Sequence, residues 1–342
     1  MLSPADILVI PYDPQFSRAG VQYARDSLHF TYNRMRLTTT DRLRKIVTGI
    51  AFEMATRRWL EAAAIRYSRL GATAFTESDR FDLALGGRRC DLKCSLIYDK
   101  HKIAALHADP GWALDAEALV PEDQFEAERM GENDIYVFGF VTGLEAHHST
   151  DTEKAIAKNL PIYLVHTPPS DLWAEVAPWR SLGELALKSN ANTPLTLELG
   201  GQNEKRQAVR QRVRLLPRAR TPLKQDFYSV LYLAAPHLPL SLIGLHSPVL
   251  SHTHLVESSD WVNIWVYGQR VYLCGWLNKH DFRQHSRRLP AQSLVKQYTR
   301  TAVANRALPM RELRSMAELL DLAKRYAGVN DRSQKLDAED HF

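Results

Sequence analysis

The chain has 342 residues, of which 45% are hydrophobic and 24% are charged. This length and composition predict a packed globular protein with a real core, in one large domain or two of ordinary size. Three cysteines, an odd number, exclude a disulfide framework, and the first residues contain neither the basic segment of a secretion signal nor an apolar run that could span a membrane. We therefore expect a cytoplasmic protein without a membrane partner.

The net charge of +5 is modest but unevenly distributed along the chain. Residues 201–300 contain 15 Lys and Arg against 5 Asp and Glu, so the rest of the chain carries a net negative charge. A basic segment of this kind is typical of a protein that binds the phosphate backbone of nucleic acid. A solvated basic face without a ligand is the alternative interpretation.

The first long element is a helix expected over about residues 40–70. The sequence TTTD offers N-cap residues at its start, and Gly71 can terminate it. Glu53 shares one face of this helix with apolar or small residues, and a second, mostly apolar face lies beside it. The face with Glu53 contains Ile46, Gly49, Ile50 and Leu60. The second face contains Phe52, Thr56, Trp59 and Ala63. The helix should therefore be buried on more than one side.

A hairpin follows in the sequence FDLALGGRRCDLKCSLI. Residues 81–85 and 88–97 are predicted strands, and between them lies the pair Gly86 and Gly87, whose tolerance of positive φ suits a tight turn. Asp91 and Lys93 project from the same face of the second strand, because side chains alternate along a strand. Asp82, on the first strand, comes close to them. Two carboxylates and an ammonium are costly on a half-buried sheet unless a cation, a partner charge or water relieves them.

Acidic and strand-forming stretches make up the remaining chain. Residues 109–134 are strongly acidic and predict a helix or loop insertion, and residues 135–143 predict a core strand. A domain boundary is expected near Thr150. The second half is richer in strands, including a hairpin formed by WVNIWVY and RVYLCGWL, and a helix is expected over residues 309–326. The other strands are predicted at residues 162–167, 195–199, 208–216 and 227–234.

Glu53, Asp82, Asp91 and Lys93 together have the chemistry of a metal-dependent hydrolase. Mg²⁺ prefers oxygen ligands and is usually held by one or two carboxylates with waters and substrate phosphates, and Asp82 and Asp91 can supply the carboxylates. Lys93 can orient or deprotonate the attacking water, or stabilise the charge that develops on phosphorus. Glu53 can reach a second metal ion, or the same water, from the helix.

The motifs GIAFEMA, FD and DLK, taken together, resemble those of the PD-(D/E)XK nuclease superfamily, also called restriction-endonuclease-like. The resemblance covers roughly residues 43–143, and it departs from the family pattern in having Phe81 instead of proline before Asp82. It implies that Glu53 is the helix acid, Asp82 the first metal-binding acid, and Asp91 with Lys93 the signature pair. It also implies Mg²⁺ or Mn²⁺ as the cofactor.

The same resemblance implies a fold and a substrate. We expect an α/β restriction-endonuclease-like core with a mixed central sheet over residues 1–150, and a strand-rich α+β domain that binds nucleic acid or a partner over residues 151–328. Residues 329–342 are expected to be disordered. The implied activity is endonucleolytic hydrolysis of phosphodiester bonds, most often in DNA, in bacterial restriction or anti-phage defence. Cutting both strands of a duplex implies a homodimer or a partner subunit.

Three other interpretations stay open. Asp91 and Lys93 can form a surface cross-strand pair, with Glu53 a solvated helix residue. The chain can be a degenerate copy of the fold, a subunit that binds nucleic acid without cleaving it. It can also be a structural adaptor of a larger complex that holds a partner through the acidic residues 109–134.

Two groups of arginines are candidates for nucleic-acid contacts. Arg210, Arg212 and Arg214 alternate along a predicted strand and share one face, while the opposite face keeps apolar residues. Such a row can grip phosphates without reading sequence, and Arg218 adjoins it. A solvated edge strand that uses Arg to prevent aggregation is the alternative. The second group, near a predicted helix, consists of Arg283, Arg287 and Arg288.

Other motifs are weaker. His252 and His254 share a face of an extended segment and His246 is nearby, but loop histidines without a carboxylate or cysteine partner are usually unliganded. The sequence has no glycine-rich phosphate-binding loop and no G-x-S-x-G motif, so neither nucleotide binding nor acyl transfer is predicted.

Overall fold

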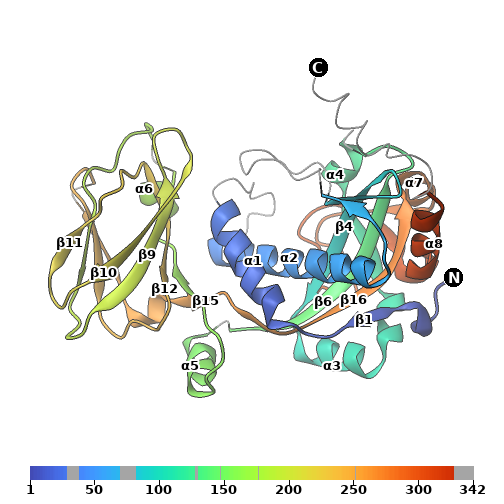
Figure 1. The fold of residues 1–342 in the computed structure, drawn as a ribbon, viewed down its shortest axis with the longest axis horizontal. Coiled ribbons are helices and arrows are strands. Elements are labelled where there is room, and N and C mark those ends of the chain that lie inside the picture. Colours follow the sequence, from blue (N-terminus) through green and yellow to red (C-terminus); the bar gives the residue numbers. More distant parts are fainter. Residues whose placement is uncertain are drawn as a thin grey trace. The chain divides into compact units, whose positions relative to one another are not determined.

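The computed structural model describes residues 1–28, 38–69, 82–127, 130–146, 148–175, 177–250 and 252–326. These residues form two compact units, and Figure 1 labels many of their helices and strands. The first unit comprises Met1–Gly20, Val47–Leu144 and the described residues from Tyr267 on, and the second comprises Val21–Ile46 and Glu145–Val266.

This division differs from the boundary expected near Thr150, because the chain returns to the first unit after leaving the second. The strand β16 (Val266–Asn278) lies between β1 (Leu8–Ile10) and β6 (Ile135–Glu145) in one sheet. Residues 267–326, expected in the second domain, therefore belong to the first unit. The residues of a strand do not specify a partner far away in the chain, so the sequence has no local signal for this return. The predicted tail, residues 329–342, lies outside the described residues.

A mixed sheet of six strands forms the centre of the first unit, in the order β1-β16-β6-β4-β3-β2. The strands β4 and β6 pair in parallel, whereas the pairs β2/β3, β3/β4 and β1/β16 are antiparallel. The predicted mixed α/β class with a mixed sheet is thereby confirmed. The strands not yet delimited are β2 (Tyr67–Ser68), β3 (Leu83–Leu85) and β4 (Arg88–Ile97).

Both faces of this sheet are covered by apolar side chains. On one face the core includes residues of α1 (Pro14–Ser27), α2 (Thr39–Ala62) and α8 (Met316–Tyr326). On the other face it includes residues of α3 (Lys100–Ala108), the short helix η2 (Pro110–Asp115) and β5 (Glu117–Pro121). The sheet is therefore the middle layer of the first unit.

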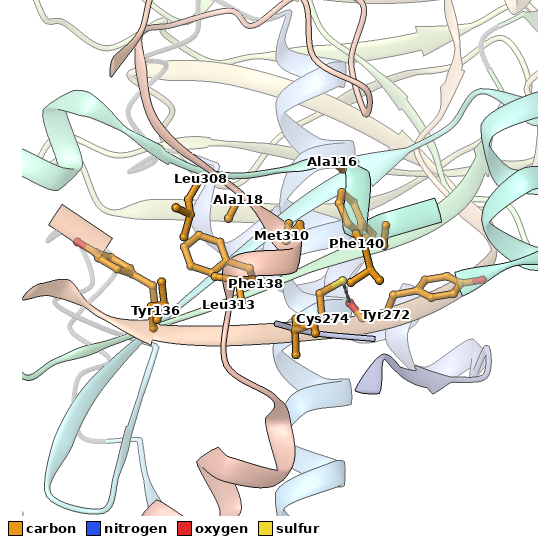
Figure 2. Packing of buried hydrophobic residues seen from close by; sticks show 14 of the residues in the cluster. Ala116, Ala118, Tyr136, Phe138, Phe140, Tyr272, Cys274, Leu308, Met310 and Leu313 are labelled. Atoms are coloured by element: carbon orange, nitrogen blue, oxygen red, sulfur yellow. Dashed lines mark hydrogen bonds between the residues drawn. The ribbon is translucent and has the colours of Figure 1, made fainter. Parts of the chain in front are cut away.

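The strand β6 illustrates how this burial is encoded. Tyr136, Phe138 and Phe140 project into the core that α3 and β5 cover, whereas Val137 and Val141 project into the opposite core. Figure 2 shows the three rings in their core, near Leu308 and Met310. Because both faces are buried, the strand is a nearly continuous apolar run, as predicted for residues 135–143.

The acidic residues 109–134 contain η2, β5 and a short helix, α4 (Glu122–Glu126), and are not an appended insertion. Ala118 and Val120 of β5 are fully buried, because alternate side chains of that strand face the core. The strand β5 pairs with β18 in a small antiparallel sheet, β17-β18-β5. The remaining elements of the unit are η1 (Pro4–Asp6), α7 (Lys279–His285), β17 (Arg287–Leu289), β18 (Asn305–Pro309) and η4 (Met310–Glu312).

A glycine allows α2 to approach the sheet closely. A Cβ atom on Gly139 of β6 would lie 2.1 Å from the carbonyl oxygen of Tyr272 and 2.6 Å from the ring of Phe52 on α2. Any side chain at this position would therefore push the helix and the neighbouring strand away. Since α2 also carries Glu53, this contact fixes the position of Glu53 relative to β4 and β6.

We expect Gly139→Ala to destabilise the protein by about 1–3 kcal/mol, the usual cost of overpacking a close contact. The free energy of unfolding from urea denaturation measures the effect. Gly49→Ala is the matched control, because nothing lies within 4 Å of its Cβ position on α2. That control should be neutral or slightly stabilising, since alanine favours helix over glycine. Equal effects of the two substitutions would contradict the close packing.

The helix α2 ends at Ala62, earlier than the predicted end near Gly71. Ala64 has a φ of 55°, and the backbone N–H of Ile65 donates to the carbonyl of Leu60 at 2.9 Å. These contacts form a Schellman-type C-terminus with alanine where glycine is usual, so a search for glycine misses it. None of the helices in the described ranges is both long and apolar enough to cross a membrane.

The second unit is built mainly from two antiparallel sheets. Their strand orders are β10-β9-β12-β7-β15 and β11-β8-β13-β14, and residues of both sheets share one apolar core. The strands are β7 (Leu164–His166), β8 (Ala186–Ser189), β9 (Leu195–Gln202), β10 (Ala208–Leu215), β11 (Arg220–Pro222), β12 (Ser229–Ala235), β13 (Ile243–Ser247), β14 (His252–Val256) and β15 (Val262–Asn263). The unit also contains the helices α5 (Ser149–Ala157), α6 (Ser170–Trp173) and η3 (Ser258–Asp260), together with the end of α1 and the start of α2. The unit therefore has sandwich architecture, and its strand-rich character is as predicted.

Two predicted elements of the C-terminal part are wrong in detail. The expected hairpin around Gly268 is absent, because β16 runs without interruption from Val266 to Asn278 and Gly268 adopts its φ of 60° inside the strand. The expected helix over residues 309–326 begins only at Met316, because Pro309 ends a strand that pairs with β5. Pairing with distant strands overrides the local turn and helix signals in both places.

Candidate functional site

The predicted hairpin is confirmed by β3 and β4, which meet at a two-residue turn. Gly86 and Gly87 have φ values of 57° and 71°, the positive pair that a type I′ turn requires. The pairing places Leu83, the first residue of β3, opposite Cys90. Asp82 directly precedes β3 and lies at the open end of this hairpin. Phe81 lies outside the described residues.

Two hydrogen bonds hold Asp82 beside the second strand. Its backbone N–H donates to the carbonyl of Cys90 at 3.1 Å, and its Oδ2 accepts from the backbone N–H of Leu92 at 2.5 Å. The carboxylate is therefore fixed against the backbone of the residue that separates Asp91 from Lys93.

Lys93 bridges Asp91 to a residue of another element. Its Nζ donates to Asp91 Oδ1 at 2.8 Å and lies 2.6 Å from Oδ2, and it donates to Gln124 Oε1 of α4 at 3.1 Å. The side chains are mostly buried, with 23% of Asp91 and 16% of Lys93 exposed. The two residues thus form an ion pair along one strand, less solvated than the predicted surface alternative.

The electrostatics of Asp82 connect all four predicted residues. Burial raises the pKa of Asp82 well above its usual range, and the carboxylates of Asp91 and Glu53 raise it further. The Lys93 ammonium and the Leu92 N–H lower the pKa, but they do not cancel the effect. Glu53, Asp91 and Lys93 therefore all act on the charge of Asp82, although Glu53 comes from a helix and the other two from β4.

Glu53 is held by a neighbour on its own helix. It forms an ion pair with Arg57 one turn later, and 23% of the Glu53 side chain is exposed. This spacing of an acid and a base on a helix was readable from the sequence. The predicted alternative of a solvated Glu53 does not fit this degree of burial.

Two further residues of the site escaped the sequence-based prediction. Gln124 lies in α4, and no local signal links a short acidic helix to Lys93. Tyr136, the second residue of β6, lies beside Asp91 in the parallel register, and its hydroxyl is buried without a hydrogen-bond partner among the described residues. Burial and the carboxylates of Asp91 and Asp134 raise the pKa of Tyr136, so the hydroxyl stays protonated and can donate. Its strand position could have suggested it.

The carboxylates have the chemistry that Mg²⁺ or Mn²⁺ requires, but not a preformed cage. Glu53, Asp82 and Asp91 offer oxygen donors, and their mutual repulsion is the charge that a divalent cation relieves. In the described ranges no three His, Cys, Asp or Glu side chains converge closely enough to hold an ion. Lys93 occupies both oxygens of Asp91, so a cation must displace it from at least one of them. The chemistry of the three carboxylates therefore fits such an ion, but the side chains must move before they can hold it together.

In the second unit, β10 carries the predicted row of arginines on an edge of its sheet. Arg210, Arg212 and Arg214 are exposed, while Val213 and Leu215 are buried, which confirms the alternation. Arg212 and Arg214 have no ion-pair partner among the described residues.

The other two arginines near this edge have partners within the unit. Arg210 forms an ion pair with Asp26 of α1 at 2.6 Å. Arg218 donates to Asn192 Oδ1 at 3.0 Å. Arg212 and Arg214 are therefore the better candidates for contacts with an external anion.

The second group of arginines contacts the acidic residues 109–134. Arg283 pairs with Glu132 at 2.7 Å, Arg287 with Glu117 at 2.6 Å, and Arg288 with Glu122 at 2.7 Å. Asp115 of the same stretch pairs with Lys296 and with Arg311. The acidic residues 109–134 and the basic residues 283–311, far apart in the sequence, thus neutralise one another within the first unit.

Comparisons with protein-family models, curated proteins and solved structures find no match to this chain.

Proposed function

We propose that the protein is a metal-dependent nuclease whose active site consists of Glu53, Asp82, Asp91 and Lys93. The observation that carries the proposal is the environment of Asp82, a carboxylate held against β4 with its pKa raised by burial and by two other carboxylates. Such an arrangement is costly for folding, and it is typical of sites in which a cation is bound.

The order of the elements supports the proposal. Glu53 lies on α2, Asp82 directly precedes β3, and Asp91 with Lys93 lies on β4, which pairs in parallel with β6. A helix with an acid, a strand with an acid, and a strand with D-x-K around a mixed sheet are the features of a restriction-endonuclease-like core. This fold assignment, like the activity, is part of the proposal.

The chain's own residues have separable tasks in this reaction. Glu53, Asp82 and Asp91 would hold a divalent cation, which supplies Lewis-acid polarisation of the scissile phosphate when bound. Lys93, oriented by Gln124, would neutralise charge that develops on the phosphoryl oxygens. Tyr136 offers a protonated hydroxyl beside Asp91.

We propose DNA as the substrate, with Arg212 and Arg214 of β10 as backbone contacts. Cleavage of both strands of a duplex requires two such sites, so we expect a homodimer or a partner subunit. A role in restriction or anti-phage defence stays a prediction from the resemblance. The adaptor alternative loses support, because at least four acidic residues of the stretch 109–134 are paired within the chain.

Incubation of the purified chain with plasmid DNA tests the proposal. We expect nicking or linearisation with Mg²⁺ or Mn²⁺ and none with excess chelator. Single-stranded DNA and RNA are included in parallel, since the polymer is the least constrained part of the proposal. Binding of DNA without cleavage at any metal concentration would favour the non-cleaving alternative. Neither binding nor cleavage of any of these polymers would contradict the proposal.

The double variant Arg212→Gln, Arg214→Gln should bind duplex DNA more weakly than the parent, whatever the sequence. Each lost phosphate contact lowers the slope of log K against log salt by about one unit, so the variant's slope should fall by about two. Fluorescence anisotropy across a salt series measures it. Arg283→Gln is the control. Because Arg283 is paired with Glu132, this substitution should change the slope little. An unchanged slope in the double variant would return β10 to the solvated-edge interpretation.

A further inference from the structure

Two histidines face each other between the sheets of the second unit. His166 is the last residue of β7, and its side chain lies on the same face as the core residue Leu164. His254 lies in β14 opposite Leu245, whose side chain belongs to the same core. Both imidazoles therefore occupy inner-face positions of the sandwich, where apolar side chains are usual. The motif around Thr253 did not reveal this, because His166 is far away in the sequence.

The ring nitrogens of the two histidines meet directly. Their Nε2 atoms are 2.8 Å apart, and the rings are stacked with centroids 5.0 Å apart. The Nδ1 of His166 lies 3.2 Å from the carbonyl oxygen of Asp260, which can only accept, so Nδ1 carries a proton. In a neutral His166 the Nε2 atom therefore carries no proton, and its lone pair faces His254.

Burial lowers the pKa of His166 and so favours its neutral form. The rings of Trp261 and Trp173 lie 6.2 Å from those of His166 and His254, respectively, and both tryptophans are buried. The histidines themselves are only partly buried, so a small ion can enter without unfolding the unit.

We propose that His166 and His254 form a binding site for a borderline transition-metal ion such as Zn²⁺, Co²⁺ or Ni²⁺. Imidazole is a preferred ligand of these ions, and a histidine that binds a metal usually donates its other ring N–H to a carbonyl, as His166 does to Asp260. Since no third His, Cys, Asp or Glu joins the pair in the described ranges, water completes the coordination.

Little rearrangement is needed to accept the ion. Two nitrogens at about 2.0–2.1 Å from a tetrahedral ion are roughly 3.4 Å apart, so the rings must separate only slightly from their present 2.8 Å. The proton on Nε2 of His254 has to leave that atom, to Nδ1 of the same ring or to solvent, before this nitrogen can bind the ion. Because β7 and β14 belong to different sheets, the bound ion would cross-link the two sheets.

Calorimetric titration of the full chain with Co²⁺ and Zn²⁺ tests this site, with excess Mg²⁺ present to compete for carboxylate ligands. We expect one imidazole-bound ion per chain and at least a tenfold loss of affinity in both His166→Gln and His254→Gln. His246→Gln is the matched control, because His246 lies on the outer face of the same hairpin and contacts Thr253. The ion should raise the thermal midpoint of the parent and of this control only.

Equal affinity in all four proteins, or no binding to the parent, would overturn the proposal and leave the pair as a hydrogen bond only. If a variant does not fold, the parent still decides the question. With ¹⁵N-labelled histidine, Ni²⁺ should broaden the two signals that report the coupled Nε2 pair before any others. Earlier broadening of other histidines would contradict the site. Neither outcome depends on nuclease activity, so the two proposals fail separately.

Discussion

Asp91→Asn should abolish Mg²⁺-dependent cleavage while leaving the fold intact, with a loss of at least about 10²–10³-fold in rate. The carboxylate is the acid of the D-x-K pair, and it is the partner of Lys93 in the present arrangement. Asparagine keeps its size and one oxygen but removes the charge that holds a cation. The rate of plasmid cleavage at saturating Mg²⁺ measures the effect.

Lys93→Met should cause a loss of similar size for a different reason, because it removes a charge near the phosphate and leaves the carboxylates in place. Asp115→Asn serves as the control, since Asp115 is an ion-paired acid outside the site. The free energy of unfolding must be measured for each variant. Full activity of Asp91→Asn would show that the site is assigned wrongly, and unfolding of both site variants would favour a structural role for the pair.

Asp82→Asn should stabilise the protein in metal-free buffer, by an amount on the order of 1 kcal/mol. The substitution removes a carboxylate that Asp91 and Glu53 repel, and the asparagine oxygen can still accept the hydrogen bond from the Leu92 N–H. The same variant should lose cleavage. A gain in stability combined with a loss of activity is the pattern of a residue placed for function at a cost to folding.

The pH dependence of that effect has a definite sign. The pKa of Asp82 is raised in the folded state above the unfolded value near 3.8, so the folded chain binds its proton more tightly. Deprotonation therefore costs stability, which falls as the pH rises from about 4 through the raised folded value. Urea denaturation with chelator at several pH values should show Asp82→Asn gaining on the parent as pH increases. A parent that gains on the variant with rising pH would contradict the account.

The local parts of the site could be predicted from the sequence, and its long-range parts could not. The turn at Gly86 and Gly87 and the shared face of Asp91 and Lys93 follow from glycine's tolerance of positive φ and from strand alternation. The contact of Lys93 with Gln124 depends on how α4 packs. Neither the periodicity of apolar residues nor a motif in residues 109–134 encodes this packing.

The same distinction holds for the fold. The parallel partner of β4 was recognised as a core strand because β6 is apolar on both faces. The path of β16 was missed, because Gly268 between two apolar runs is a strong hairpin signal and only pairing with β1 and β6 keeps the strand extended. Likewise, the arginines near residue 285 suggested a phosphate-binding surface, whereas acids from residues 117–132 pair with them in the fold.

Mn²⁺ binding followed by electron paramagnetic resonance tests directly, without requiring the correct substrate, whether Glu53, Asp82 and Asp91 together bind a divalent cation as we propose. We expect the full chain to bind Mn²⁺ and excess Mg²⁺ to displace it. Asp91→Asn and Asp82→Asn should each weaken the binding at least tenfold, and Asp115→Asn should bind like the parent. Equal binding of Mn²⁺ by the parent and both site variants would show that these carboxylates do not form a cation site.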